Sequence, residues 1–397
     1  MSFPPPLIPK SLPPNAKIAL VSPSARVNNL VPDALARSQT LLQNLGYTVT
    51  TLFTPTSEDL DPVTSQGEPI PAGIRNRLAE LRAAFADPSV DMVLCTVGGA
   101  TATELIPYLV EDEILQRLIR ENPKIFVGYS DITVLHWCLR ALTGLRTFYG
   151  PCAVANLGEA VTSTPSSVSS FDFSQEPREI KQQDDGYLQD FQLAHLLRTL
   201  TTPNKPPGPF PRSTFYAPVI PPYFLGPSTR TSTTPRTLLP SPAWTWLRKG
   251  RRAEGPLFGG CLTVVARIQG IPRISPDWKG KIMFLESATA EADMTKGNPL
   301  GRVRQAFADL AARGLFEEIA GLVVGRPYGY NTERERAEYA ATIQGLLCKG
   351  RLENTTFPIL MNVDVGHTAP LVTLSMDALA VLDSEKDEFS ITQAVVI

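Results

Sequence analysis

The first 150 residues alternate between strand-like and helix-like segments, and this alternation restricts the possible folds more than any other feature of the sequence. Buried-strand patterns occupy 17–22, 47–53, 90–99 and 124–131, and helical apolar spacing occupies 33–45, 74–87 and 103–119. Strands that alternate with helices pair in parallel, because each helix returns the chain to the same end of the sheet. The sequence therefore predicts an N-terminal α/β domain whose parallel sheet is covered on both faces.

The chain is too long for the N-terminal domain alone. Its 397 residues exceed what a single hydrophobic core usually organises. Twelve of the 37 prolines fall between Pro203 and Pro242, which predicts a long loop or linker. We expect an N-terminal domain at 1–170, a Ser- and Pro-rich interdomain linker and substrate loop at 171–250, and a C-terminal α/β domain at 251–397. The β-rich end of the C-terminal domain, beginning at Phe357, predicts an antiparallel meander.

Composition excludes several classes of function. Lys and Arg number 37 against 39 Asp and Glu, so no basic excess is present to bind nucleic acid. No apolar run is long enough to span a membrane and the N-terminus carries no secretion-type apolar segment, so we expect a cytoplasmic protein without a membrane partner. The five cysteines form no CxxC pair and the three histidines have no metal-ligand spacing. We therefore expect no metal and no cofactor.

The sharpest local motif is GYSD at Gly128–Asp131, where a strand runs into a helix. This placement puts Ser130 at a strand-to-helix turn, as a nucleophile elbow requires. The G-x-S-x-G pattern is only half met, because Ile132 occupies the place of the second glycine. The alternative is that Ser130 caps the following helix.

A serine nucleophile needs a base, which in turn needs an orienting carboxylate. Of the three histidines, His367 is favoured because it lies in a loop between Gly366 and Pro370, whereas His136 and His195 lie within helical patterns. Glu286, at the end of a buried strand, is the favoured carboxylate, although it could instead cap the next segment. Asp364 is a rival for the same role.

Two glycines, Gly98 and Gly99, form a second turn between a strand and a helix. Free backbone N–H groups in such a turn can meet negative charge. The turn is neither a GxGxxG nucleotide fingerprint nor a P-loop, and it would serve equally as an oxyanion hole.

Six segments together carry a family resemblance: IALVSPSA, VGGATATELIPYL, KIFVGYSDITVLH with TFYGP, EGPLFGGCLTVV, IMFLES and VDVGHTAPLVTL. In this order and at about this spacing, the chain resembles the LD-carboxypeptidase family of serine peptidases, in particular the branch that includes the microcin C self-immunity peptidases. The resemblance spans most of 15–392.

The resemblance implies a catalytic triad of Ser130, Glu286 and His367, with the serine on the N-terminal domain and the other two on the C-terminal one. It also implies oxyanion donors on the backbones of Gly99 and Asp131, a substrate contact at Gly98, metal-free hydrolysis and a homodimer. The implied substrate is a small peptide cleaved near its C-terminus, or a peptidyl or aminoacyl nucleotide.

The interdomain loop of that branch carries an aromatic residue that stacks on the substrate's nucleotide. Trp244 matches this position and Trp246 is the second choice, although both could instead fasten the loop to the body of the protein. The chain departs from the family in its long, proline-rich stretch at 201–244 and in Cys261, where an asparagine is usual. These departures leave open an alternative function, an inactive small-molecule or nucleotide-binding protein with the same fold.

Overall fold

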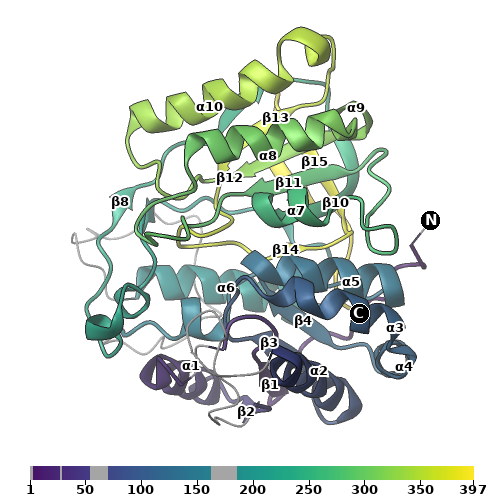
Figure 1. Cartoon of the computed structure of the whole chain (residues 1–397), viewed down its shortest axis with the longest axis vertical. Coiled ribbons are helices and arrows are strands. Elements are labelled where there is room, and N and C mark those ends of the chain that lie inside the picture. The colour runs from purple at the N-terminus through teal and green to yellow at the C-terminus, as the bar shows by residue number, and fades with distance from the viewer. Residues whose placement is uncertain (1–2, 27–28, 54–69, 162–185) are drawn as a thin grey trace.

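The computed structural model describes residues 3–26, 29–53, 70–161 and 186–397. It contains two main β-sheets, and Figure 1 shows them in two halves of the molecule, with the early residues in the lower half and residues beyond 250 mostly in the upper one. The mixed α/β class expected from the sequence is confirmed. Most of the Ser-rich stretch at 160–185, with the expected boundary at 170, lies outside the described residues, so the division into domains stays a prediction.

The lower sheet has six strands in the order β14-β5-β4-β3-β1-β2. Its strands in chain order are β1 (Lys17–Val21), β2 (Thr48–Thr51), β3 (Met92–Cys95), β4 (Ile125–Gly128), β5 (Phe148–Tyr149) and β14 (Leu374–Ser375). The first five pair in parallel, and β1, β3 and β4 are buried along almost their whole length. This is the parallel sheet that the strand–helix alternation predicts.

Helices connect these strands on both faces of the lower sheet. They are α1 (Pro32–Asn44), α2 (Ile70–Ala86), η2 (Ala102–Leu105), α3 (Ile106–Glu111), α4 (Glu113–Glu121), η3 (Ser130–Ile132), α5 (Thr133–Thr143), η4 (Ala153–Leu157) and α6 (Tyr187–Thr201). Because the strand order reverses at β1, right-handed crossovers place α1 on one face and α2 to α5 on the other. Loops after β1 and β3 therefore diverge at a switch point, where α/β folds bind ligands.

One helix expected at 103–119 is divided in the structure. The side chain of Asp112 accepts a hydrogen bond of 3.0 Å from the backbone N–H of Leu115 and so starts α4 anew. An aspartate that caps a helix competes with continuation of the preceding helix, which explains the break.

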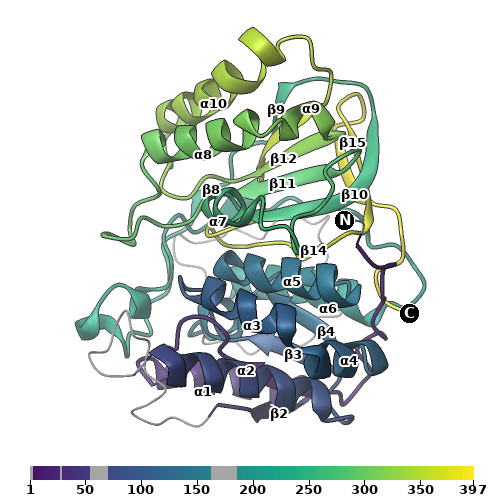
Figure 2. The same ribbon diagram turned by 45° about the vertical axis from the view of Figure 1, so that its right-hand side comes forward.

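A segment from the other half of the molecule completes the lower sheet. The short strand β14 pairs antiparallel with β5, with Leu374 opposite Tyr149, and the N–H of Met376 donates to the carbonyl of Thr147 at 2.8 Å. Figure 1 shows this segment lying between the two halves. The chain ends also meet, because Ser11 N–H donates to the Ile397 carbonyl at 2.8 Å, and Figure 2 shows both ends at the same side of the molecule.

The upper sheet has eight strands in the order β6-β16-β15-β10-β11-β12-β13-β9. They are β6 (Gly208–Pro209), β9 (Thr245–Arg248), β10 (Ala253–Cys261), β11 (Ile282–Glu286), β12 (Gly321–Gly325), β13 (Ile359–Val363), β15 (Leu379–Asp383) and β16 (Glu388–Ile391), while β7 (Phe215–Tyr216) and β8 (Leu239–Pro240) form a separate pair. The expected meander is correct for β15 and β16 but wrong for β13, which pairs in parallel with β12 and closes one more βαβ unit.

The helices of the upper half are α7 (Leu262–Ile268), α8 (Leu300–Ala312), α9 (Leu315–Glu318) and α10 (Glu333–Leu347), with short turns η6 (Pro222–Phe224), η7 (Pro227–Thr229) and η8 (Gly350–Leu352). Strands β10 to β13 follow one another in sheet order, so right-handed crossovers place α7 to α10 on one face. In the described ranges, no helix combines the length and the hydrophobicity needed to cross a membrane.

Candidate active site

Ser130 stands at the sharp turn between β4 and η3. Its φ of 65° is in the left-handed region, which a residue with a side chain adopts only under constraint. Ser130 is not a helix cap, because Tyr129 and Ile132 occupy the cap positions of η3 and α5. Gly98 makes the turn possible, since a Cβ there would lie 2.7 Å from the Ser130 Cβ. Strand, turn and glycine together present the hydroxyl at the carboxyl end of the sheet.

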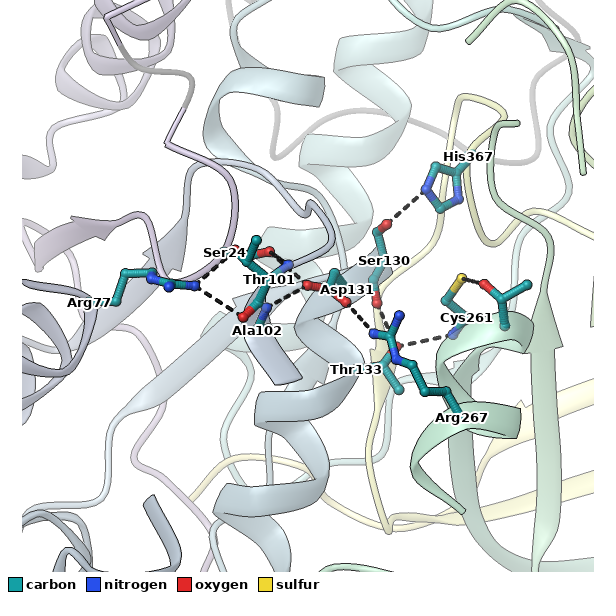
Figure 3. A network of polar contacts seen from close by, with 11 residues as sticks. Ser24, Arg77, Thr101, Ala102, Ser130, Asp131, Thr133, Cys261, Arg267 and His367 are labelled. Carbon is teal, nitrogen blue, oxygen red and sulfur yellow. Dashed lines mark hydrogen bonds and ion pairs between the residues drawn. The ribbon is translucent and has the colours of Figure 1, made fainter. Parts of the chain in front are cut away.

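The structure brings Ser130, His367 and Glu286 into one hydrogen-bonded chain. His367 Nε2 lies 2.9 Å from Ser130 Oγ, a contact drawn in Figure 3, and its Nδ1 lies 2.8 Å from Glu286 Oε2. A carboxylate only accepts, so Nδ1 carries the ring proton and Nε2 is left to accept the serine proton. Glu286 ends β11 and its side chain has no exposed surface, while that of His367, in the loop after β13, is 9% exposed.

The rival residues have other partners. His136 contacts the Thr147 hydroxyl and the Gly128 carbonyl, and burial lowers its pKa to about 4. His195 accepts from the N–H of Thr373, and burial lowers its pKa to about 3. Both rings are therefore buried and neutral near pH 7.

Asp364, the alternative carboxylate, pairs with the guanidinium of Arg326. It also accepts hydrogen bonds from the hydroxyl and the N–H of Ser213 in the proline-rich stretch. Both partners of the ion pair have side chains only 2% exposed. Asp364 thus links the start of the His367 loop to the proline-rich stretch at 201–244.

The glycine turn lies beside Ser130 and is tied to it through Asp131. One oxygen of the Asp131 carboxylate accepts from the Ser24 hydroxyl at 2.7 Å and from the Ala102 N–H at 2.8 Å (Figure 3). Its other oxygen pairs with Arg267 of α7 at 2.9 Å. Gly99 needs to be glycine, because its φ is 148° and a Cβ would lie 2.5 Å from Ser24 Oγ. The Asp131 side chain thus joins both loops of the switch point to the upper half.

Cys261 contacts the nucleophile turn through its backbone. Its N–H donates to the Thr133 hydroxyl at 3.0 Å, and that hydroxyl donates to the Ser130 carbonyl at 2.6 Å (Figure 3). The Cys261 side chain is buried, and burial followed by the charge of Glu286 raises the pKa of its thiol. The thiol is therefore a neutral, weakly polar group.

The two candidate aromatic residues contact the edges of the upper sheet. Trp244 is 9% exposed, with the guanidinium of Arg212 4.1 Å from its ring centre and Phe389 packed beside it. Trp246 donates from Nε1 to Asp387 at 2.8 Å. Trp244 thus packs between Arg212 of the proline-rich stretch and Phe389 of β16, whereas Trp246 lies half-buried on β9, opposite Leu360 of β13. A substrate role for either tryptophan stays a prediction.

A hollow of about 550 Å³ opens next to the Asp131–Arg267 pair, between α7, α8 and the loop after β11. Its wall includes Thr263, Arg267, Ala290 and Arg302. In the part of the chain that the structure describes, no cluster of three or more His, Cys, Asp or Glu side chains is arranged to hold a metal ion.

Three residues at this site were not found from the sequence. Tyr149 bridges Ser130 and Glu286, Ser24 binds Asp131, and Arg267 crosses from the upper half. The segments SPSA and TFYGP contain the first two, but neither segment indicates by itself which partner its side chain contacts.

Two protein-family models match this chain. The model of the LD-carboxypeptidase N-terminal domain matches residues 18–150, and that of the C-terminal domain matches residues 254–382. The chain belongs to the LD-carboxypeptidase family. The resemblance drawn from its six motifs is confirmed.

Individual relatives agree with this assignment. A Vibrio cholerae protein named "putative carboxypeptidase" is 25% identical over 384 residues, which is 94% of each chain. A solved MccF-like protein of Streptococcus pneumoniae, in complex with AMP, superposes with a TM-score of 0.72 at 25% identity and covers 95% of this chain and 99% of its own.

The microcin C7 self-immunity protein MccF, known from Escherichia coli, shares the fold. Its complex with aspartyl sulfamoyl adenosine superposes with a TM-score of 0.72 at 21% identity, covering 99% of this chain and all of that one.

Proposed function

We propose that this protein is a serine-type carboxypeptidase that hydrolyses an amide bond near the C-terminus of a small peptide or an aminoacyl-nucleotide conjugate. The observation that carries the proposal is the chain of hydrogen bonds from Ser130 Oγ through His367 to Glu286. Such a chain supplies an activated nucleophile, a base and an orienting carboxylate, so the reaction needs no metal.

The reaction begins when His367 takes the proton of Ser130 and the oxygen attacks the substrate carbonyl. The tetrahedral intermediate collapses to an acyl-enzyme on Ser130 as the imidazolium gives its proton to the leaving amine. His367 then activates a water that hydrolyses the ester. Glu286 holds the ring in one tautomer and stabilises its positive charge in both steps.

The negative charge of the intermediate needs hydrogen-bond donors. Ser130's own N–H is already donated to Tyr149, so other N–H groups must serve. We assign this role to the backbones of Gly99 and Asp131, which lie in the glycine turn and directly after the nucleophile. The Ser24 and Ala102 contacts of Asp131 support the assignment, because they fix the two turns relative to each other.

The substrate proposal draws on the relatives. MccF binds aspartyl sulfamoyl adenosine and the Streptococcus pneumoniae protein binds AMP, which favours an aminoacyl nucleotide for this chain. The hollow beside Arg267 offers room for a polar group of the substrate, and its wall carries both Arg267 and Arg302 and the carboxylates of Glu291 and Asp309, so an anionic group would have to lie on the arginine side. Trp244 would contact a nucleobase only if it released its contacts with Arg212 and Phe389, whereas Trp246 is half-buried on β9.

Hydrolysis of two substrates tests the proposal: a tetrapeptide ending in a D-residue and aspartyl sulfamoyl adenosine. We expect the wild type to cleave at least one, and Ser130→Ala to lower the rate by roughly a thousandfold or more. The preferred substrate identifies the branch of the family. Tight binding of either compound without cleavage would instead favour an inactive binding protein, and light scattering of the same samples tests the expected homodimer.

A further inference from the structure

Tyr149 contacts both ends of the proposed catalytic chain. Its hydroxyl lies 3.0 Å from the backbone nitrogen of Ser130 and 2.6 Å from Oε1 of Glu286. Ser130 belongs to the lower half of the molecule and Glu286 to the upper half, so one phenol oxygen joins the nucleophile turn to the carboxylate across the junction.

The direction of both hydrogen bonds follows from the donors available. A backbone N–H only donates, so the phenol oxygen accepts from Ser130. Its one proton is then directed to Glu286, whose ionised carboxylate only accepts. Oε1 is thereby occupied by Tyr149 and Oε2 by His367, so each oxygen of Glu286 has one fixed partner.

The position of the phenol is fixed by its surroundings. Tyr149 is fully buried on β5, paired on one side with Gly128 of β4 and on the other with Leu374 of β14. The rings of Phe284 and His136 lie 5.1 and 5.7 Å from its ring. A side chain packed in this way has one available rotamer, so its hydroxyl needs no reorganisation during a reaction.

We propose that Tyr149 is a positioning residue of the active site, which sets the orientation and charge distribution of Glu286 and holds the Ser130 backbone in its left-handed turn. The proposal rests on the proposed hydrolase function. In this role Tyr149 touches no substrate atom. It also exchanges no proton, because burial and the charge of Glu286 raise the pKa of the phenol well above 10. Its effect is transmitted through Glu286 to His367.

The effect of Tyr149 on Glu286 can be measured in a pH–rate profile, because the buried groups near Glu286 other than His367 do not titrate near neutral pH. Among the described residues, burial and, after it, the charge of Glu286 raise the pKa of four groups, Tyr129, Tyr149, Cys261 and Tyr339. These four groups are therefore neutral near pH 7. A change in the acid limb of a pH–rate profile then reports on the Glu286–His367 pair.

The test uses the rate of labelling by a fluorophosphonate, which reports on Ser130 and His367 without knowledge of the substrate. Tyr149→Phe removes only the hydroxyl. Loss of a hydrogen bond to a charged group corresponds to about a 10- to 100-fold slower labelling rate. The acid limb should move to higher pH, because the carboxylate charge is no longer shared with a phenol and favours the protonated imidazole.

Tyr339→Phe is the matched control. Its hydroxyl is equally buried and bonds to Ser287, directly after Glu286, but does not touch the catalytic chain. This variant should label at close to the wild-type rate. A double-mutant cycle adds a second criterion: in a Glu286→Gln background, Tyr149→Phe should slow labelling far less than in the wild type.

Three results would overturn the inference: equal labelling rates for Tyr149→Phe and Tyr339→Phe, a slower rate with an unmoved or lowered acid limb, or full additivity with Glu286→Gln. The unfolding midpoint of each variant separates these results from misfolding. If Ser130→Ala labels as fast as the wild type, the proposed function itself fails, and the two failures are thereby distinguished.

Discussion

Two buried aspartates anchor the two sides of the active site in different ways. Asp131 holds the nucleophile turn, and its ion-pair partner Arg267 belongs to the other half of the molecule and is 44% exposed. Asp364 holds the base of the His367 loop, and its partner Arg326 is 2% exposed and also contacts Ser213 and Thr368. The serine side is thus fixed mainly by backbone and hydroxyl contacts, whereas the histidine side depends on a fully buried ion pair.

The two ion pairs differ in what happens to the arginine when its aspartate partner is removed. An arginine at the surface can turn to water, while one in the interior stays desolvated without its counterion. Loss of the ion pair should therefore lower the stability of the protein less on the Ser130 side of the site than on the His367 side. The same substitution at both positions makes the comparison direct.

The largest effect is expected for Asp364→Asn. It leaves the buried Arg326 charge without a counterion, which should lower the free energy of unfolding by about 3–5 kcal/mol. Asp131→Asn keeps an acceptor for Ser24 and Ala102 and should cost about 1–2 kcal/mol. Urea unfolding of both variants measures the difference, and equal losses would contradict the contrast between the two sides.

A smaller effect per residue is expected from pH between 7.5 and 4.5, because each side of the site also holds one buried neutral histidine. His136 bonds to the Gly128 carbonyl beneath Ser130, and His195 accepts from Thr373 after the His367 loop. Their pKa values of about 4 and about 3 lie below that of an unfolded histidine. Between about pH 6.5 and these values the unfolded chain binds more protons, so stability falls as the pH falls, by up to about 1.4 kcal/mol per pH unit for each residue.

Unfolding curves at several pH values between 7.5 and 4.5 test this expectation. His136→Gln and His195→Asn should each flatten the pH dependence of the unfolding free energy below about pH 6.5, compared with the wild type. A wild-type stability that stays constant down to pH 5 would show that neither ring is held neutral.

The smallest effect is expected for Arg267→Gln. The variant leaves the buried Asp131 carboxylate with its hydrogen bonds from Ser24 and Ala102 and with an amide that can still donate to it, so the expected cost is about 1 kcal/mol. If the hollow beside it receives an anionic part of the substrate, KM should rise while the rate of fluorophosphonate labelling stays unchanged. A loss of labelling would show instead that the pair positions Ser130. Arg302→Gln, on the same wall but away from Asp131, is the matched control for binding alone.

Much of the site could be anticipated from sequence, because local patterns place Ser130 at a strand-to-helix turn, Glu286 at the end of a buried strand and His367 in a loop. The choice between Glu286 and Asp364 could not be made from such patterns. Both follow apolar runs, and only the fold shows that Arg326 occupies Asp364 while His367 lies against Glu286.

Contacts between distant segments were the main omission. Tyr149 is one of two neighbouring aromatic residues in a short run, and its two partners lie 19 and 137 positions away in the chain. The parallel pairing of β13 was missed for a similar reason, since its length and apolar character fit either direction and the intervening helix decides. The sequence also could not show that Trp244 is buried against Phe389, because that contact joins positions 145 residues apart, and the substrate role of both tryptophans stays a prediction.

The pairing of β14 with β5 also affects the order in which the parts of the candidate site form during synthesis. During synthesis, the segment up to residue 161 leaves the ribosome with β5 as a bare sheet edge and with Ser130 lacking both Glu286 and His367. Only when residues 367–375 have emerged can the edge be covered and the base arrive, and both happen through one short stretch of chain. The proposed catalytic site is thus incomplete in the nascent polypeptide until the two halves of the molecule have packed together.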